Sequence, residues 1–219
     1  GKPKQIRKIV RWLAKVELRL YQKDVLQHHG HWIIFRDWLE NMDESYIPIN
    51  VIRNAVLIKG NSVVQYNIDA DKTRLGLKWN VEITLQNIER LMSEYWSGKI
   101  NIYKMKALIG SFLLMPAYIF QIRGTEISKR DAIENKNKIF SSDVCKLLDK
   151  CSMIRLEWGK VLKCYRLYLL KIAVLISPHP FIFKYINKRI SPKFPINRFP
   201  ILTRGEVELF KKEIEQLCQ

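Results

Sequence analysis

The side chains best suited to chemistry are basic and aromatic, and they gather toward the end of the chain. Residues 155–204 hold eleven Lys or Arg residues and one acid, Glu157. Lysine and arginine neutralise phosphates, while Tyr165, Tyr185 and Phe194 would stack on unpaired bases. The basic candidates are Lys160, Lys163, Arg166, Lys184, Lys188, Arg189, Lys193, Arg198 and Arg204. We therefore expect a nucleic-acid-binding region here, against the alternative that the aromatics form core and the charges only solvate a helix face.

A second basic cluster lies at the start of the chain. Apolar residues recur at three- and four-residue spacing and predict a helix over residues 4–24. Another face of this helix carries Lys4, Lys8, Arg11, Lys15 and Arg19. Such a stripe is typical either of a solvated helix face or of a surface that grips phosphates and releases their counterions.

The charge of the whole chain narrows the class of partner. The 219 residues include 38 Lys or Arg against 21 Asp or Glu, a net charge of +17. The 47% hydrophobic content excludes a disordered chain, so this charge repels itself within a compact fold. We expect nucleic acid as the partner, RNA slightly favoured over DNA. An alternative is a structural subunit of a ribonucleoprotein or membrane-associated assembly.

Cysteine usage and apolar stretches bear on the compartment. The four cysteines form no C-x-x-C pair, which favours reduced thiols, and no secretory signal is visible, so we expect a cytoplasmic protein. The uncharged run 107–120 is shorter than a bilayer requires, and the run 165–183 is interrupted by charges and prolines. We predict no transmembrane span, with association in the plane of a membrane surface as the alternative.

Two clusters could bind a metal, although a structural interpretation is favoured for both. Asp69 and Asp71 would point the same way on a strand, with Glu82 as a third ligand, but the polar residues that follow favour a turn. The histidines at 28, 29 and 31 are typical of a loop. No catalytic triad and no phosphate-binding glycine motif is present. We therefore expect no metal and no cofactor.

The expected fold is α+β and mainly helical, with a small antiparallel β-meander. Short apolar runs predict strands over 32–35, 55–58 and 63–66, and strict alternation over 75–85 predicts another. We place a domain boundary after residue 85, with residues 1–85 holding the first helix and the sheet. Residues 86–219 form a helical domain with a basic, proline- and aromatic-rich tail.

Helix boundaries in the second domain follow from capping residues. Helices are predicted near 86–98, over 104–122 with a kink at Pro116, and over 154–176. Ser128 with Asp131 predicts one helix start, Ser142 or Asp143 another, and Thr203 caps a final helix over 205–217.

One stretch resembles a known family. Residues 123–134 (RGTEISKRDAIE) resemble the G-x-x-(I/V)-S-K-(R/K)-x-A element in the helical domain of minimal nucleotidyltransferases and aminoglycoside adenylyltransferases. Residues 154–158 are similar in placement, and residues 54–60 look like the last strand of the family's catalytic domain. The resemblance implies a nucleotidyltransferase-like enzyme, or a fragment of one, that would use Mg²⁺. The family's catalytic Gly-Ser and Asp-x-Asp would precede Gly1, so no catalytic residue carries over.

Overall fold

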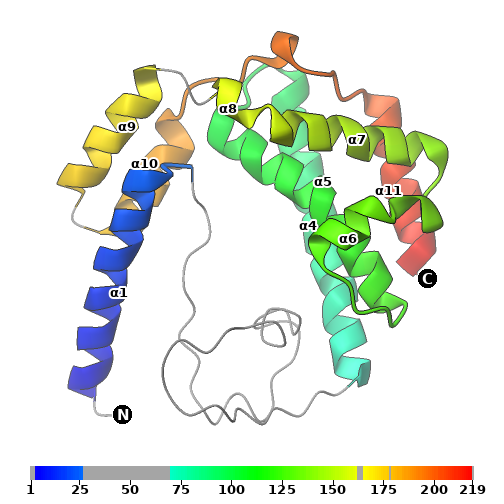
Figure 1. Cartoon of the computed structure of the whole chain (residues 1–219), viewed down its shortest axis with the longest axis horizontal. Coiled ribbons are helices and arrows are strands. Elements are labelled where there is room, and N and C mark those ends of the chain that lie inside the picture. Colours follow the sequence, from blue (N-terminus) through cyan, green and yellow to red (C-terminus); the bar gives the residue numbers. More distant parts are fainter. Residues whose placement is uncertain (1–2, 27–69, 162–164, 178, 219) are drawn as a thin grey trace. The chain divides into compact units, whose positions relative to one another are not determined.

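The computed structural model describes residues 3–26, 70–161, 165–177 and 179–218 (Figure 1). Within these residues the chain is helical and contains no β-strand, so the expected meander is wrong there. The strands expected over 32–35, 55–58 and 63–66 lie outside the described residues, as do the three clustered histidines.

Contacts divide the chain into two compact units. Unit 1 comprises Gly1–Trp32, Leu91–Leu108 and Ile154–Phe199. Unit 2 comprises Ile33–Arg90, Ile109–Met153 and Pro200–Gln219. The domain boundary predicted after residue 85 falls inside α4 (Ala70–Trp96), and both units take residues from α4 and from α5 (Ile102–Ile122).

The alternating segment 75–85 lies within α4, so the strand predicted there is wrong. A two-residue alternation also contains pairs four residues apart, which share a helix face. Leu77 and Val81 are buried on the same face of the helix as Ile88. Leu75, Trp79 and Ile83 point outward and are exposed. The buried residues from Leu77 onward therefore follow the spacing of a helix and not that of a strand.

Unit 1 is built around α1 (Pro3–Lys23), α9 (Tyr165–Ile176) and α10 (Pro180–Ile190), which contact one another (Figure 1). The first helix was predicted correctly. The buried rings of Tyr21 and Phe183 join α1 to α10, with centroids 4.9 Å apart. The predicted helix over 154–176 is instead divided among α7 (Ser142–Leu156), α8 (Trp158–Val161) and α9.

A short aromatic stack completes the core of unit 1. Trp158 of α8 lies over Phe194 with ring centroids 5.9 Å apart, and Phe194 packs on Phe199 at 4.9 Å. All three rings are buried. This stack ties α8 to the segment that follows α10, where a 3₁₀ turn, η2, covers Ile196–Arg198.

Unit 2 packs α5, α6 (Lys129–Glu134), α7 and α11 (Arg204–Cys218), with a 3₁₀ turn, η1, over Lys136–Lys138. The ring of Phe210 on α11 meets Phe112 of α5 and Phe140 before α7. Ser128 caps α6 as predicted, because its Oγ accepts from the Asp131 amide at 3.2 Å. The cap of α7 is Ser141 rather than Ser142 or Asp143, since the Val144 amide donates to its hydroxyl.

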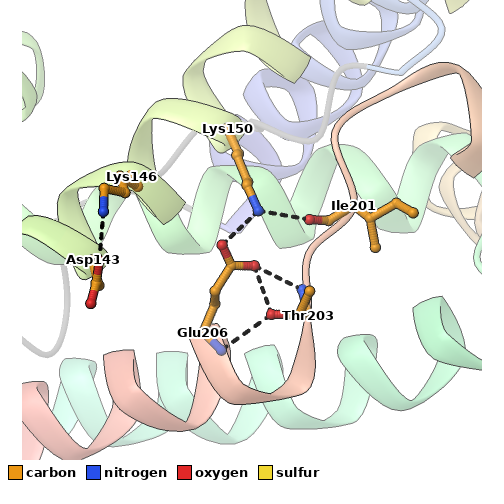
Figure 2. A network of polar contacts seen from close by, with 6 residues as sticks. All are labelled: Asp143, Lys146, Lys150, Ile201, Thr203 and Glu206. Atoms are coloured by element: carbon orange, nitrogen blue, oxygen red, sulfur yellow. Dashed lines mark hydrogen bonds and ion pairs between the residues drawn. The ribbon is translucent and has the colours of Figure 1, made fainter.

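Thr203 and Glu206 form a reciprocal cap at the start of α11, as the sequence predicted for Thr203. The Glu206 amide donates to Thr203 Oγ1, while the Thr203 amide donates back to Glu206 Oε2 at 3.0 Å. Figure 2 shows that Lys150 Nζ on α7 also reaches Glu206 Oε1 and the Ile201 carbonyl. Burial by itself would raise the pKa of the Glu206 carboxyl, but the hydrogen bonds from Lys150 and Thr203 hold it below its ordinary value.

The lowered pKa of Glu206 makes this cap sensitive to acid. A carboxyl with a lowered folded-state pKa stabilises the fold at neutral pH and loses that contribution as the pH falls through its lowered value. Glu206→Gln keeps a capping amide but loses the charge, so we expect a loss of about 1 kcal/mol near pH 7. Urea unfolding near pH 7 and near pH 3 should show this difference shrinking in acid. Glu208→Gln, exposed on the same helix, is the control. A Glu206→Gln difference that does not vary with pH would contradict the assignment.

Candidate anion-binding site

A basic cleft lies in unit 1 between the α4–α5 turn and the end of α10. Its volume is about 490 Å³, within the range of roughly 300–1,000 Å³ common for small-molecule sites. Its described lining consists of Lys99, Asn101, Lys104, Tyr185, Lys188, Arg189, Ser191 and Lys193. Five of these side chains are cations, and no carboxylate is among them. We call this site the basic cleft.

An isolated antiparallel bridge brings the two sides of the basic cleft together. Asn101 pairs with Lys193 across the bridge. The Phe194 amide donates to the Ile100 carbonyl at 2.9 Å, and the Ile102 amide donates to the Pro192 carbonyl at 2.9 Å. The α4–α5 turn passes through Gly98, whose φ of +67° suits glycine. These bonds join Lys99 and Lys104 to a segment almost 90 residues later in the chain.

Two buried asparagines hold the backbone next to the basic cleft through hydrogen bonds. Asn101 Nδ2 donates to the Lys188 carbonyl at 2.8 Å, and its Oδ1 accepts from the Lys104 amide at 2.8 Å. Asn187, which is 0% exposed, accepts from Ser191 Oγ at 2.6 Å and donates to the Val25 carbonyl. Satisfied buried amides of this kind order the backbone that carries the cations.

Within the described part of unit 1, the charges of the basic cleft are only partly compensated. Lys104 Nζ pairs with Glu94 Oε2 at 2.5 Å. The Arg189 guanidinium lies 4.4 Å from the centroid of the exposed Tyr185 ring, a cation–π arrangement. Lys99, Lys188 and Lys193 are exposed at the rim. The cleft therefore offers several cationic donors and a flat guanidinium–phenol pair to an incoming anion.

The predicted stripe on α1 forms a second basic surface in unit 1. Lys4, Lys8, Arg11 and Lys15 border one hollow, which Arg7 and Trp12 also line. Trp12 is 62% exposed. Arg19 is exposed one turn beyond Lys15 and is not part of the hollow's lining. The four-residue repeat identified the lysines, whereas Arg7 and Trp12 were missed.

The remaining predicted residues are placed differently. Lys188, Arg189 and Lys193 meet in the basic cleft, while Lys184 is half-buried on α10 and Arg198 is exposed on η2. Arg204 begins α11 in unit 2. The side chains of Lys160, Lys163, Tyr165 and Arg166 lie outside the described part of the structure. Phe194 is buried in the aromatic stack, so its ring faces protein rather than solvent.

The acidic cluster gives no support to a metal site. Asp69 lies outside the described residues, and Asp71 is exposed in the first turn of α4 rather than on a strand. Glu82 follows eleven residues later on the same helix, about 16 Å along its axis. Among the residues that the structure describes, no three His, Cys, Asp or Glu side chains group as metal ligands.

The segment that resembles nucleotidyltransferases has structural roles in unit 2. Gly124 follows α5 with a φ of +80°, Ser128 caps α6, and Ala132 is buried against Ala117 and Phe120. A turn, a cap and a small buried residue explain this part of the motif without a ligand. The resemblance itself stays a prediction.

Comparison of the chain with protein-family models, with curated proteins and with solved structures finds no significant match. Within the described residues, α5 alone is long and apolar enough to cross a membrane by length and composition, and 61% of its most apolar window is buried in the fold. A buried core helix passes the same test, so the absence of a transmembrane span stays a prediction. The basic cleft and the α1 stripe are the surfaces of the described structure that bear on function.

Proposed function

We propose that the protein binds nucleic acid through the basic surfaces of unit 1, with single-stranded RNA as the favoured ligand. The observation that carries the proposal is the basic cleft, where five cations and no carboxylate are found among the described lining residues. Cations at this density favour a ligand with closely spaced negative charges, and a phosphodiester backbone has them.

The shape of the basic cleft favours a single strand over a duplex. Its volume suits one nucleotide unit of a flexible strand rather than a rigid double helix, with the neighbouring phosphates at the rim where its lysines are exposed. Its wall carries the Tyr185–Arg189 pair. Unpaired bases have free faces that stack on aromatic rings and on guanidinium planes. The bases of a duplex are already stacked on one another and do not offer these faces. Asn101 and Ser191 add polar side chains to the lining. The α1 stripe supplies further phosphate contacts along the same unit.

A salt titration of the unmodified protein tests this function. Lys104 is paired with Glu94, so the other four cations of the cleft are counted: four phosphate contacts on a single strand give a slope near −2.8 in log affinity against log salt, about 0.7 per contact. We expect the affinity for labelled single-stranded RNA to fall about 50-fold between roughly 50 and 200 mM salt. The affinities for single-stranded DNA, duplex RNA and duplex DNA, measured in the same salt series, show which class of nucleic acid the protein prefers.

Polyglutamate, a polyanion without phosphates or bases, is the matched competitor for the titration. RNA that displaces labelled RNA far better than polyglutamate at equal charge supports the proposal. Equal displacement, or no binding at physiological salt, would overturn it.

A further inference from the structure

A second surface of unit 1 is apolar, and the basic cleft does not use it. The outward face of α9 carries Tyr168, Leu169, Ile172, Leu175 and Ile176, all of them exposed. The opposite face buries Leu167, Leu170 and Val174. Lys171, also exposed, borders the outward face, but the five residues named on it are apolar or aromatic, and such a face normally lies against a core or lipid. Among the described residues of unit 1, none covers this surface.

The apolar surface continues across the connection into α10. Residues 177–179 join the two helices, and Phe181 and Ile182 in the first turn of α10 are exposed. Leu175 and Ile176 lie just before this connection, with exposed fractions of 68% and 80%. Phe181 is 72% exposed. We call Leu175, Ile176, Phe181 and Ile182 the hairpin tip.

Exposed tyrosines and cations lie behind the hairpin tip on both helices. Tyr168 on α9 and Tyr185 on α10 are exposed about 10 Å and 6 Å back from the tip along their helices. Lys188 and Arg189 follow one turn beyond Tyr185, and both are exposed. Exposed Lys171 lies on α9 between the tip and Tyr168, so cations lie on both sides of the tyrosines. An apolar tip backed by tyrosines and cations matches a bilayer, which presents hydrocarbon and then an anionic interface that lysine side chains reach along their apolar stems.

We infer that the α9–α10 hairpin docks on an anionic lipid bilayer, with its tip in the interfacial layer. The apolar segment 167–176 spans about 15 Å as a helix, half of the roughly 30 Å hydrocarbon core, so it can enter the membrane surface but not cross it. Cations near the tip favour a negatively charged surface over a neutral one. This inference does not rest on nucleic-acid binding.

Vesicle cosedimentation of the whole chain tests the inference. The probes are vesicles of phosphatidylcholine alone and of phosphatidylcholine mixed with phosphatidylserine. We expect binding to the mixed vesicles, and a loss of about 10²-fold or more in partition coefficient for the variant Leu175→Ser, Ile176→Ser, Phe181→Ser. Because these side chains are exposed, the substitutions leave the buried core intact.

A matched variant controls for general surface hydrophobicity. Leu75, Leu156 and Ile201 are 69%, 85% and 60% exposed, and they lie on α4, at the end of α7 and before α11. The variant Leu75→Ser, Leu156→Ser, Ile201→Ser should bind mixed vesicles like the unmodified protein. RNA affinity of the hairpin-tip variant should be unchanged, which separates this inference from the proposed function.

Three results would overturn the inference. The first is equal vesicle binding by the hairpin-tip variant and the unmodified protein. The second is equal loss in both triple variants. The third is a dimer without lipid, seen by analytical ultracentrifugation, that the hairpin-tip variant converts to monomers, since the apolar face would then join two copies of the chain.

Discussion

Replacing Lys188, Arg189 and Lys193 together with glutamine lowers the affinity for single-stranded RNA by about 10²-fold at about 0.1 M salt. Each phosphate contact on a single strand contributes about 0.7 to the salt slope, which is about fivefold in affinity at this salt concentration. Three contacts therefore give about two orders of magnitude, and the slope falls by about 2. All three side chains are exposed at the basic cleft, so glutamine is accommodated there.

The control for this variant removes the same number of charges from unit 2. Lys138, Lys146 and Lys212 are exposed there, on η1, α7 and α11. Their combined replacement by glutamine should change the affinity and the slope little, because only contacts with bound phosphates release counterions. Fluorescence anisotropy across a salt series measures both quantities. Equal losses in the two variants would show that net charge alone drives binding, and the basic cleft would lose its assignment.

Local signals in the sequence predicted the terminal helices. The helix over 4–24 and the final helix over 205–217 match α1 and α11 within one or two residues at each end. Each has a single apolar face at helical spacing, and Thr203 marks the start of the second with a cap that the structure contains. Where periodicity and capping residues agree, the local sequence is sufficient to predict a helix and its ends.

The segment 75–85 shows why the same reasoning failed elsewhere. Its alternation satisfies both a strand period and the four-residue helical spacing, and only the residues after it separate the two. Leu77 and Val81 continue into Ile88, which belongs to a buried helical face. The strand prediction used only the alternation within residues 75–85 and did not consider that the buried face continues to Ile88 at helical spacing.

The basic cleft was only half predictable. Lys188, Arg189 and Lys193 stood out because positive charge is dense in their segment. Lys99 and Lys104 had no such signal, since they reach the site through hydrogen bonds between residues 100–102 and 192–194. Pairing over this separation depends on tertiary packing, so no local pattern marks it. Phe194 was misassigned for the same reason, because the stack with Trp158 buries it.

Asn187→Ala should destabilise the region around α10 by about 3 kcal/mol. The substitution leaves the Val25 carbonyl and the Ser191 hydroxyl without their partner inside the fold, and each buried unsatisfied group costs about 1–3 kcal/mol. Asn187 is 0% exposed, so water does not replace its amide without opening the core. Amide hydrogen exchange measured by mass spectrometry over α10 peptides should show faster exchange, and peptides from α11 in unit 2 serve as the internal reference.

Ser191→Ala separates the two hydrogen bonds that Asn187 makes. This variant keeps the Asn187 bond to the Val25 carbonyl and leaves one buried group, Asn187 Oδ1, without its donor instead of two, so it should cost about half as much, roughly 1–2 kcal/mol. We expect Asn187→Ala to lose more stability than Ser191→Ala, because only Asn187→Ala breaks the link from α10 to the end of α1. If the two variants lost equal stability, that link would contribute nothing. Since Lys188 and Arg189 directly follow Asn187, a loosened α10 should also weaken RNA binding at the basic cleft, by less than the loss of the three cations does.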